Sequence, residues 1–130
     1  MPAENEQGAG MTTGHPQEAP LTVQVRHTQG REAVCRVAGD LDIETLAPAQ
    51  ESLSGLLGQG PPVLVVDLEE VGFCDSSGLN LLLRTRSAAL EAGIDFRLAA
   101  VAPTVMRVLE LTGARAVFSI HDSVDAALAV

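Results

Sequence analysis

This 130-residue sequence contains no lysine and very few aromatic residues. Three residues are aromatic, all of them Phe, and there is no Trp or Tyr. The eight basic residues are all Arg, and 17 Asp and Glu outnumber them, so the formal net charge is −9. Proteins that bind nucleic acids use clustered basic side chains for the phosphates and aromatic side chains for the bases. The composition therefore argues against nucleic acid as a partner, and the charge argues equally against an anionic membrane surface.

The sequence also lacks the features of metal sites and membrane segments. Cys35 and Cys74 are far apart and lie in apolar stretches, and no spacing of Cys and His is typical of a zinc site. No stretch approaches the roughly 18 consecutive apolar residues of a membrane-spanning helix. The N-terminus has neither the basic start nor the apolar core of a signal peptide. We therefore expect a soluble, cytoplasmic protein that needs no metal or cofactor.

The chain divides into a tail and one domain. Residues 1–20 are rich in Gly, Pro, Glu and Gln and contain no branched aliphatic residue, so they have too little apolar surface to offset the entropy of ordering. We predict a flexible tail there. Residues 21–130 have the length of a single domain, and because aromatic residues are so few, the core of this domain has to be aliphatic.

Hydrophobic periodicity predicts an alternation of strands and helices in this domain. Alternating apolar residues over 21–26 and a second strand over 32–38, separated by a turn at Gly30, predict a β-hairpin. Four consecutive apolar residues over 63–66 are typical of a strand covered on both faces. The other predicted elements are a helix capped by Thr45 and stopped near Gly58, a helix over 76–92, a strand over 95–101, a helix over 103–112, a strand over 117–120 and a helix over 124–130 capped by Ser123. The order β-β-α-β-α-β-α-β-α predicts an α/β fold with one mixed sheet, which begins with the hairpin and has helices packed on it.

The helix predicted over residues 76–92 is the longest. Its buried face is expected to consist mainly of Leu79, Leu82, Leu83 and Leu90. Gly93 follows as a C-terminal stop. Asp75 or Ser76 is placed to cap the first turn of this helix.

Two short segments at the predicted edge of the sheet are candidates for a functional site, residues 39–42 (GDLD) and 72–78 (GFCDSSG). Strands joined by crossover connections end at the same edge of a sheet, so we expect the two segments to lie close together. Ser76 is placed at a helix start, where free N–H groups and the helix dipole favour a negative group such as a phosphate. The alternative is that Asp75 or Ser76 is only a helix cap.

Three segments, in the correct order, resemble the signature of a known family. Residues 65–79 (VVDLEEVGFCDSSGL) are similar to the signature stretch of anti-anti-sigma factors, the single-domain bacterial members of the STAS (sulfate transporter and anti-sigma antagonist) family. Residues 39–42 resemble the first signature loop of that family. Residues 108–113 (VLELTG), followed by Val117, Phe118 and residues 122–124 (DSV), resemble its C-terminal pattern. The resemblance covers residues 21–130.

This resemblance implies a function and a set of site residues. An unphosphorylated antagonist of this family binds an anti-sigma factor, usually an ATP-dependent serine kinase, and so frees a sigma factor for transcription. The kinase phosphorylates the first hydroxyl after the motif Asp, which is Ser76 here, and a separate phosphatase restores the unphosphorylated form. The implied partner-binding residues are Asp40, Asp42, Asp75, Ser76, Ser77, Gly78 and Leu79.

Other functions explain the same residues less well. A STAS scaffold or a subunit of a larger complex, such as a stressosome or a lipid-transport ATPase, would need no phosphorylation switch, but transport subunits often lack the phosphoacceptor that Ser76 provides here. An enzyme is not expected, because the DSSG segment is not a Gly-x-Ser-x-Gly motif and no His is placed as a base. Asp42 and Asp75 are expected to contact a cationic partner, or else only to cap helices.

Overall fold

The computed structural model describes residues 20–130, so the tail predicted for residues 1–20 lies outside the described part of the chain except for Pro20. The elements follow the predicted order. They are β1 (Thr22–His27), β2 (Ala33–Leu41), α1 (Ala47–Gln59), β3 (Val63–Cys74), α2 (Ser76–Ala92), β4 (Asp95–Ala99), α3 (Pro103–Thr112), a 3₁₀ turn (Ala114–Val117), β5 (Ser119–His121) and α4 (Val124–Leu128). Within residues 20–130, no helix has the length and apolar character needed to cross a membrane.

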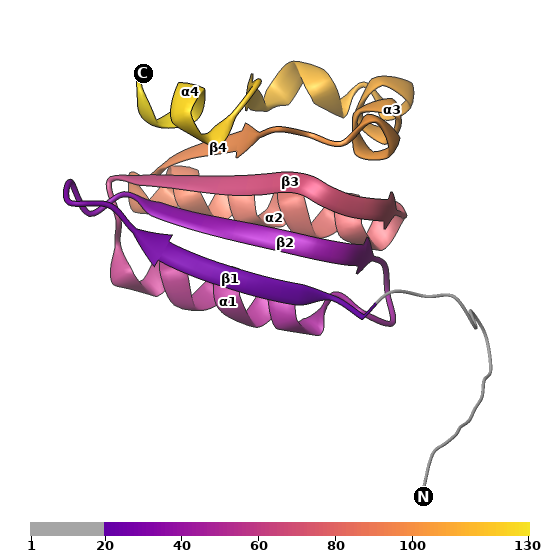
Figure 1. The fold of residues 1–130 in the computed structure, drawn as a ribbon, viewed down its shortest axis with the longest axis horizontal. Helices are drawn as coiled ribbons and strands as arrows, with labels where there is room; N and C mark the ends of the chain where they lie inside the picture. The colour runs from indigo at the N-terminus through magenta and orange to yellow at the C-terminus, as the bar shows by residue number, and fades with distance from the viewer. Residues whose placement is uncertain (1–19) are drawn as a thin grey trace, which may run out of the picture.

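The five strands form one mixed sheet in the order β1-β2-β3-β4-β5, and Figure 1 shows β1 to β4 side by side in this order. β1 and β2 pair antiparallel as the predicted hairpin, and the other neighbouring strands pair in parallel. Leu64, Val65 and Val66 of the central strand β3 are all fully buried. Consecutive residues of a strand face opposite sides of the sheet, so both sides are covered here, as the unbroken apolar run predicts. The predicted α/β fold is confirmed.

Helices cover both faces of this sheet. α1 and α2 lie along one face (Figure 1), where Leu53 and Leu82 pack with Leu64 and other sheet residues in the larger core cluster. α4 packs on the other face, where Ala127 belongs to a smaller cluster that includes Val65. Apart from Phe96, Phe118 and the two cysteines, the buried residues of both clusters are aliphatic, as the composition requires.

The last helix, α4, is shorter than the predicted 124–130. The Ser123 hydroxyl accepts a hydrogen bond from the Ala126 amide at 3.0 Å, which confirms the predicted cap. The buried Arg97 of β4 donates through Nη1 to the Ala127 carbonyl, and its Nη2 pairs with Asp95 at 2.7 Å. The bond from Arg97 to Ala127 attaches the short helix to the sheet.

β2 and β3 are both longer than the sequence pattern predicts. Residues 39–41 and 72–74, which were expected outside the strands, are the last residues of β2 and β3, and the two strands pair as far as Leu41 and Cys74. The register shifts twice between Arg36 and Asp40. Such irregularities interrupt the two-residue alternation of side chains, so the apolar pattern ends before the strands do.

The predicted cap of α1 is wrong. The helix begins at Ala47 after Leu46, without a side-chain hydrogen bond at its N-cap. The Thr45 hydroxyl instead donates to the Asp40 carbonyl, so it holds the turn that precedes the helix. Pro48 stands in the first turn, as predicted, where its missing N–H costs little.

Two strands near the C-terminus are shorter than predicted. β4 ends at Ala99, because Ala100 takes a left-handed backbone conformation with φ of 53°. The strand expected over 117–120 begins only at Ser119, because residues 114–117 form a 3₁₀ turn. Both differences arise from local backbone conformations that the apolar pattern does not encode.

α2 spans Ser76–Ala92, the predicted range. Leu79 and Leu82 are buried and Leu83 is partly buried, as expected. Leu90 is 62% exposed, so its predicted burial is wrong. In the last turn of the helix the fully buried residue is Ala89.

Candidate partner-binding site

α2 begins at the predicted phosphorylation site. Asp75 is the N-cap, and its Oδ1 accepts hydrogen bonds from the Ser77 and Gly78 amides at 2.8 and 3.1 Å. Ser76 is the first helical residue and is exposed, whereas Ser77 is half-buried. The capping role of Asp75 is therefore confirmed. Of the two adjacent serines, Ser76 is the more accessible to another protein.

Gly78 lies where the end of β2 meets α2. Leu41 pairs with Cys74 in the sheet, and the Leu41 carbonyl accepts a hydrogen bond from the Asp75 amide at 3.3 Å. A Cβ atom on residue 78 would lie 2.4 Å from the Leu41 oxygen and 2.9 Å from the Cys74 Sγ. A methyl group cannot approach other atoms so closely, so only glycine fits at this position. Gly78 and the following Leu79 are both buried, and they seat the helix on the sheet.

Asp42 shapes the turn that follows β2. It is 5% exposed, and its Oδ1 accepts hydrogen bonds from the Glu44 and Thr45 amides at 2.9 and 3.2 Å. It follows directly after Leu41, whose carbonyl bonds to the Asp75 amide, so the structure brings this turn next to the start of α2. The expectation that the two predicted segments lie close together is borne out.

The edge of the sheet formed by these segments is acidic. Residues 39–46 contain three acidic residues, residues 69–80 contain three more, and neither segment contains Lys or Arg. Glu70 pairs with Arg36 of β2 at 3.3 Å. The field of this edge favours a cationic surface on a partner. Among residues 20–130, no group of three or more His, Cys, Asp or Glu is arranged to hold a metal ion.

Cys74 and Cys35 belong to the core of the domain. Both are buried, and neither forms a disulfide. Burial raises the pKa of the Cys35 thiol to about 12. Burial, and to a lesser extent the neighbouring Asp75 carboxylate, raises the pKa of the Cys74 thiol to about 11. Both thiols are therefore protonated near neutral pH and behave as small apolar side chains, not as nucleophiles.

The sequence pattern did not predict two exposed apolar residues at this edge. Ile43, in the turn after β2, is 71% exposed, and Phe73, the last but one residue of β3, is 45% exposed. The sequence signal for both is a large apolar residue inside an acidic segment. The exposure of Ile43 and Phe73 depends on where β2 and β3 end. The apolar pattern of the sequence did not predict that Phe73 lies on a strand.

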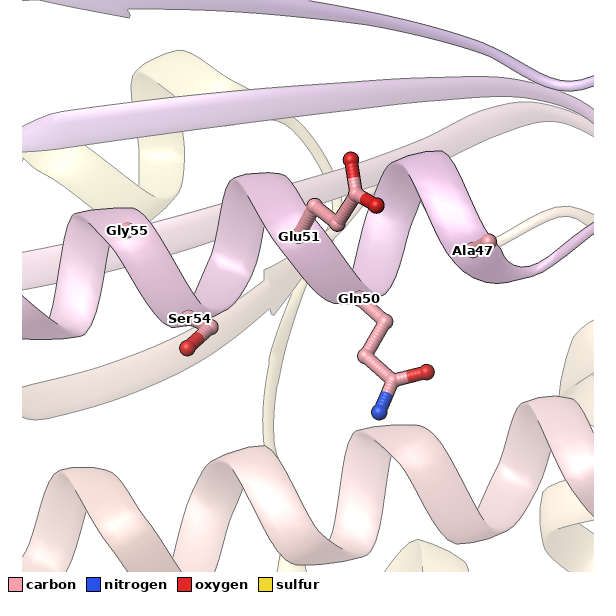
Figure 2. Close-up of a pocket in the computed structure, with 5 residues that line it drawn as sticks. All are labelled: Ala47, Gln50, Glu51, Ser54 and Gly55. Atoms are coloured by element: carbon pink, nitrogen blue, oxygen red, sulfur yellow. The ribbon is translucent and has the colours of Figure 1, made fainter.

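A shallow pocket of about 670 Å³ lies on α1, and none of its lining residues belongs to the two predicted segments. It is lined by Ala47, Gln50, Glu51, Ser54 and Gly55. Figure 2 shows that the Gln50 and Ser54 side chains point toward the neighbouring helix. Glu51 is the one charged residue of the lining, and no His or Cys accompanies it, so the pocket offers no set of groups for acid–base or nucleophilic catalysis.

Residues 22–127 match the model of the STAS domain, which is most of the chain. The chain belongs to the STAS domain family. The family match covers β1 to α4 of this STAS domain, including the two strand ends and the start of α2 that form the acidic edge.

Similar proteins of this family are anti-sigma factor antagonists. This STAS domain protein is 30% identical over 108 residues to the anti-sigma-F factor antagonist RsfB of Mycobacterium tuberculosis, over 83% of this chain and 87% of that protein. An anti-sigma factor antagonist from Mycobacterium paratuberculosis superimposes with a TM-score of 0.77 at 29% identity, over 84% of this chain and 92% of that one.

The fold is also shared with the anti-sigma factor antagonist SpoIIAA. Its unphosphorylated form superimposes with a TM-score of 0.66 at 25% identity, over 82% of this chain and 93% of that one. The phosphorylated form of SpoIIAA, from Bacillus, gives a TM-score of 0.65 at 21% identity, over 82% and 96% of the two chains. The same fold therefore exists in both states of that relative.

Replacing Gly78 with Ala is expected to destabilise the STAS domain by about 1–3 kcal/mol, because the new methyl group meets a backbone carbonyl that is part of the β2–β3 pairing. The matched control is Gly55→Ala in α1, where nothing lies within 4 Å of the added Cβ. This control should stabilise the protein by about 0.5–1 kcal/mol, because Ala is the better helix former. Urea unfolding measures both changes, and wild-type stability of Gly78→Ala would contradict the close contact.

Proposed function

We propose that this protein is an anti-sigma factor antagonist that acts in the cytoplasm. In its unphosphorylated form it binds an anti-sigma factor with serine kinase activity, and a sigma factor is released. Phosphorylation of Ser76 by that kinase ends the binding, and a phosphatase that acts on phospho-Ser76 restores it. The protein is a binding module in this scheme and catalyses no reaction itself.

The exposed Ser76 hydroxyl at the start of α2 is the observation that carries this proposal. It follows the capping Asp75, which holds the helix start in place through the Ser77 and Gly78 amides. A kinase needs a hydroxyl that it can reach, and Ser76 is more exposed than Ser77. Similar proteins named as anti-sigma factor antagonists support the same function.

The geometry also explains how a phosphate could change binding without unfolding the domain. An anion near a helix N-terminus is favourable by about 0.3–1 kcal/mol, so the folded state tolerates it. The Ser77 and Gly78 amides already donate to Asp75, so they are not available to cover a phosphate on Ser76. The added charge of about −1.5 to −2 therefore stays at the surface, where it changes how a partner fits against this edge.

Ser76 is expected to be the phosphoacceptor. The anti-sigma factors of the serine-kinase type from the source bacterium are purified as a panel, each is incubated with this protein and ATP, and the modified peptide is mapped by mass spectrometry. We expect one kinase to phosphorylate wild type and Ser77→Ala but not Ser76→Ala. The Ser77→Ala control keeps the backbone amide that bonds to Asp75.

Phosphate on Ser77 alone, or on neither serine with any kinase of the panel, would contradict this assignment. Specific binding to a purified subunit of a lipid-transport ATPase, without phosphorylation, would favour the alternative of a STAS subunit without a switch.

We expect Asp75 to contribute to kinase binding through its negative charge, in addition to capping α2. Asp75→Asn keeps the Oδ1 acceptor, so the free energy of unfolding should change by less than about 0.5 kcal/mol, while binding to the kinase should weaken or phosphorylation should slow. Asp75→Ala also removes the cap and should cost about 0.5–2 kcal/mol of stability.

Asp42→Asn tests the second carboxylate, which is nearly buried and should affect binding less. Unchanged binding and phosphorylation in both Asn variants would leave only structural roles for these carboxylates.

A further inference from the structure

Ile43 and Phe73 are large, solvent-exposed apolar residues on the two segments that meet the start of α2. Ile43 is 71% exposed and Phe73 is 45% exposed. Scattered exposed apolar residues are normal on a protein surface and need no explanation. These two differ because they stand on the two segments that end side by side at the edge where Ser76 is exposed.

Because aromatic residues are scarce in this chain, the exposed position of Phe73 is a stronger indication of an interface. The other two, Phe96 and Phe118, are buried and pack against each other with their ring centroids 6.3 Å apart. Among the three aromatic residues of the chain, Phe73 is thus the one that the core does not bury. Aromatic side chains are enriched at the centres of protein interfaces, because they bury a large area at a small cost in side-chain entropy.

The backbone holds both residues in fixed positions. Phe73 pairs with Asp40 in the β2–β3 ladder, one residue before the last pair of that ladder. Ile43 lies in a turn whose neighbouring amides, those of Glu44 and Thr45, donate to the buried Asp42 carboxylate. A backbone that is already ordered loses little further freedom when a partner binds, which favours affinity.

The charge around the pair indicates what kind of surface fits it. Residues 39–46 and 69–80 carry three acidic residues each and no basic residue. A partner that covers Ile43 and Phe73 has to approach through this negative field, which steers basic surfaces toward it and repels acidic ones. The complementary surface is an apolar pocket bordered by Arg or Lys side chains.

We infer that Ile43 and Phe73 are the apolar anchors that hold the anti-sigma factor, an inference that rests on the function proposed above. The kinase surface that takes them is an apolar pocket with basic residues at its rim. Burial of Ile43 and Phe73 supplies most of the binding free energy, and the charge state of Ser76 decides whether the two surfaces come together. Ile43 and Phe73 therefore determine how tightly the kinase binds, and the phosphate on Ser76 determines whether it binds.

The test measures the affinity of anchor variants for the kinase that phosphorylates Ser76, in titration calorimetry with the purified proteins. Ile43→Ala and Phe73→Ala should each bind at least roughly tenfold more weakly than wild type. The matched controls are Leu90→Ala and Leu111→Ala, which remove similar side chains that are 62% and 75% exposed on α2 and α3. The controls should bind within about twofold of wild type.

Two further measurements distinguish a loss of apolar anchoring from other causes of weaker binding. Phe73→Thr keeps a residue that favours strands, so a loss of binding in this variant at an unchanged melting temperature supports anchoring. Raising the salt concentration should weaken wild type and both anchor variants by the same factor, because the anchors are uncharged, whereas Asp75→Asn should respond less to salt.

The outcomes distinguish this inference from the function on which it rests. If wild type binds and is phosphorylated but the anchor variants bind like the Leu90 and Leu111 controls, the anchoring role is overturned and the proposed function stands. If wild type binds no kinase of the panel, the proposed function fails and the inference fails with it. Equal losses in anchor and control variants would also overturn it.

Discussion

The close approach of the end of β2 to the start of α2 is the constraint on which the rest of the site depends. Leu41 pairs with Cys74, and its carbonyl bonds to the Asp75 amide and lies where a side chain on residue 78 would stand. This contact fixes the helix start relative to the turn after β2. The contact is made by backbone atoms and a glycine, and the Ser76 side chain next to it is exposed.

Features that depend on short-range chemistry could be predicted from the sequence. The central strand follows from four consecutive apolar residues at 63–66, and the cap at Ser123 follows from a hydroxyl before an apolar helix. The helix stops at Gly93 and Gly113 follow because both residues adopt a left-handed conformation that glycine accepts at little cost. In each case the residues that decide the structure are neighbours in the chain.

Features that depend on contacts between distant segments could not be predicted in the same way. The register shifts between β2 and β3 extend both strands beyond their apolar pattern. The Thr45 hydroxyl bonds to the Asp40 carbonyl and not to the helix that follows it. The exposure of Ile43 and Phe73 depends on where the paired strands end. The sequence motif was sufficient to locate Ser76. Which residues surround Ser76 at the surface could be determined only from the tertiary structure.

We propose that phosphorylation of Ser76 changes binding and leaves the fold intact. The most direct measurement compares the unphosphorylated and fully Ser76-phosphorylated proteins, by calorimetric titration with the kinase and by thermal melting. We expect a loss of affinity of roughly two orders of magnitude or more, because the interface would have to cover a phosphate of about −1.5 to −2 charges, and covering a charge without full pairing costs several kcal/mol. The melting temperature should stay within about 5 °C. Equal affinity of the two forms, or a loss of affinity that accompanies unfolding of the phosphorylated protein, would contradict this proposal.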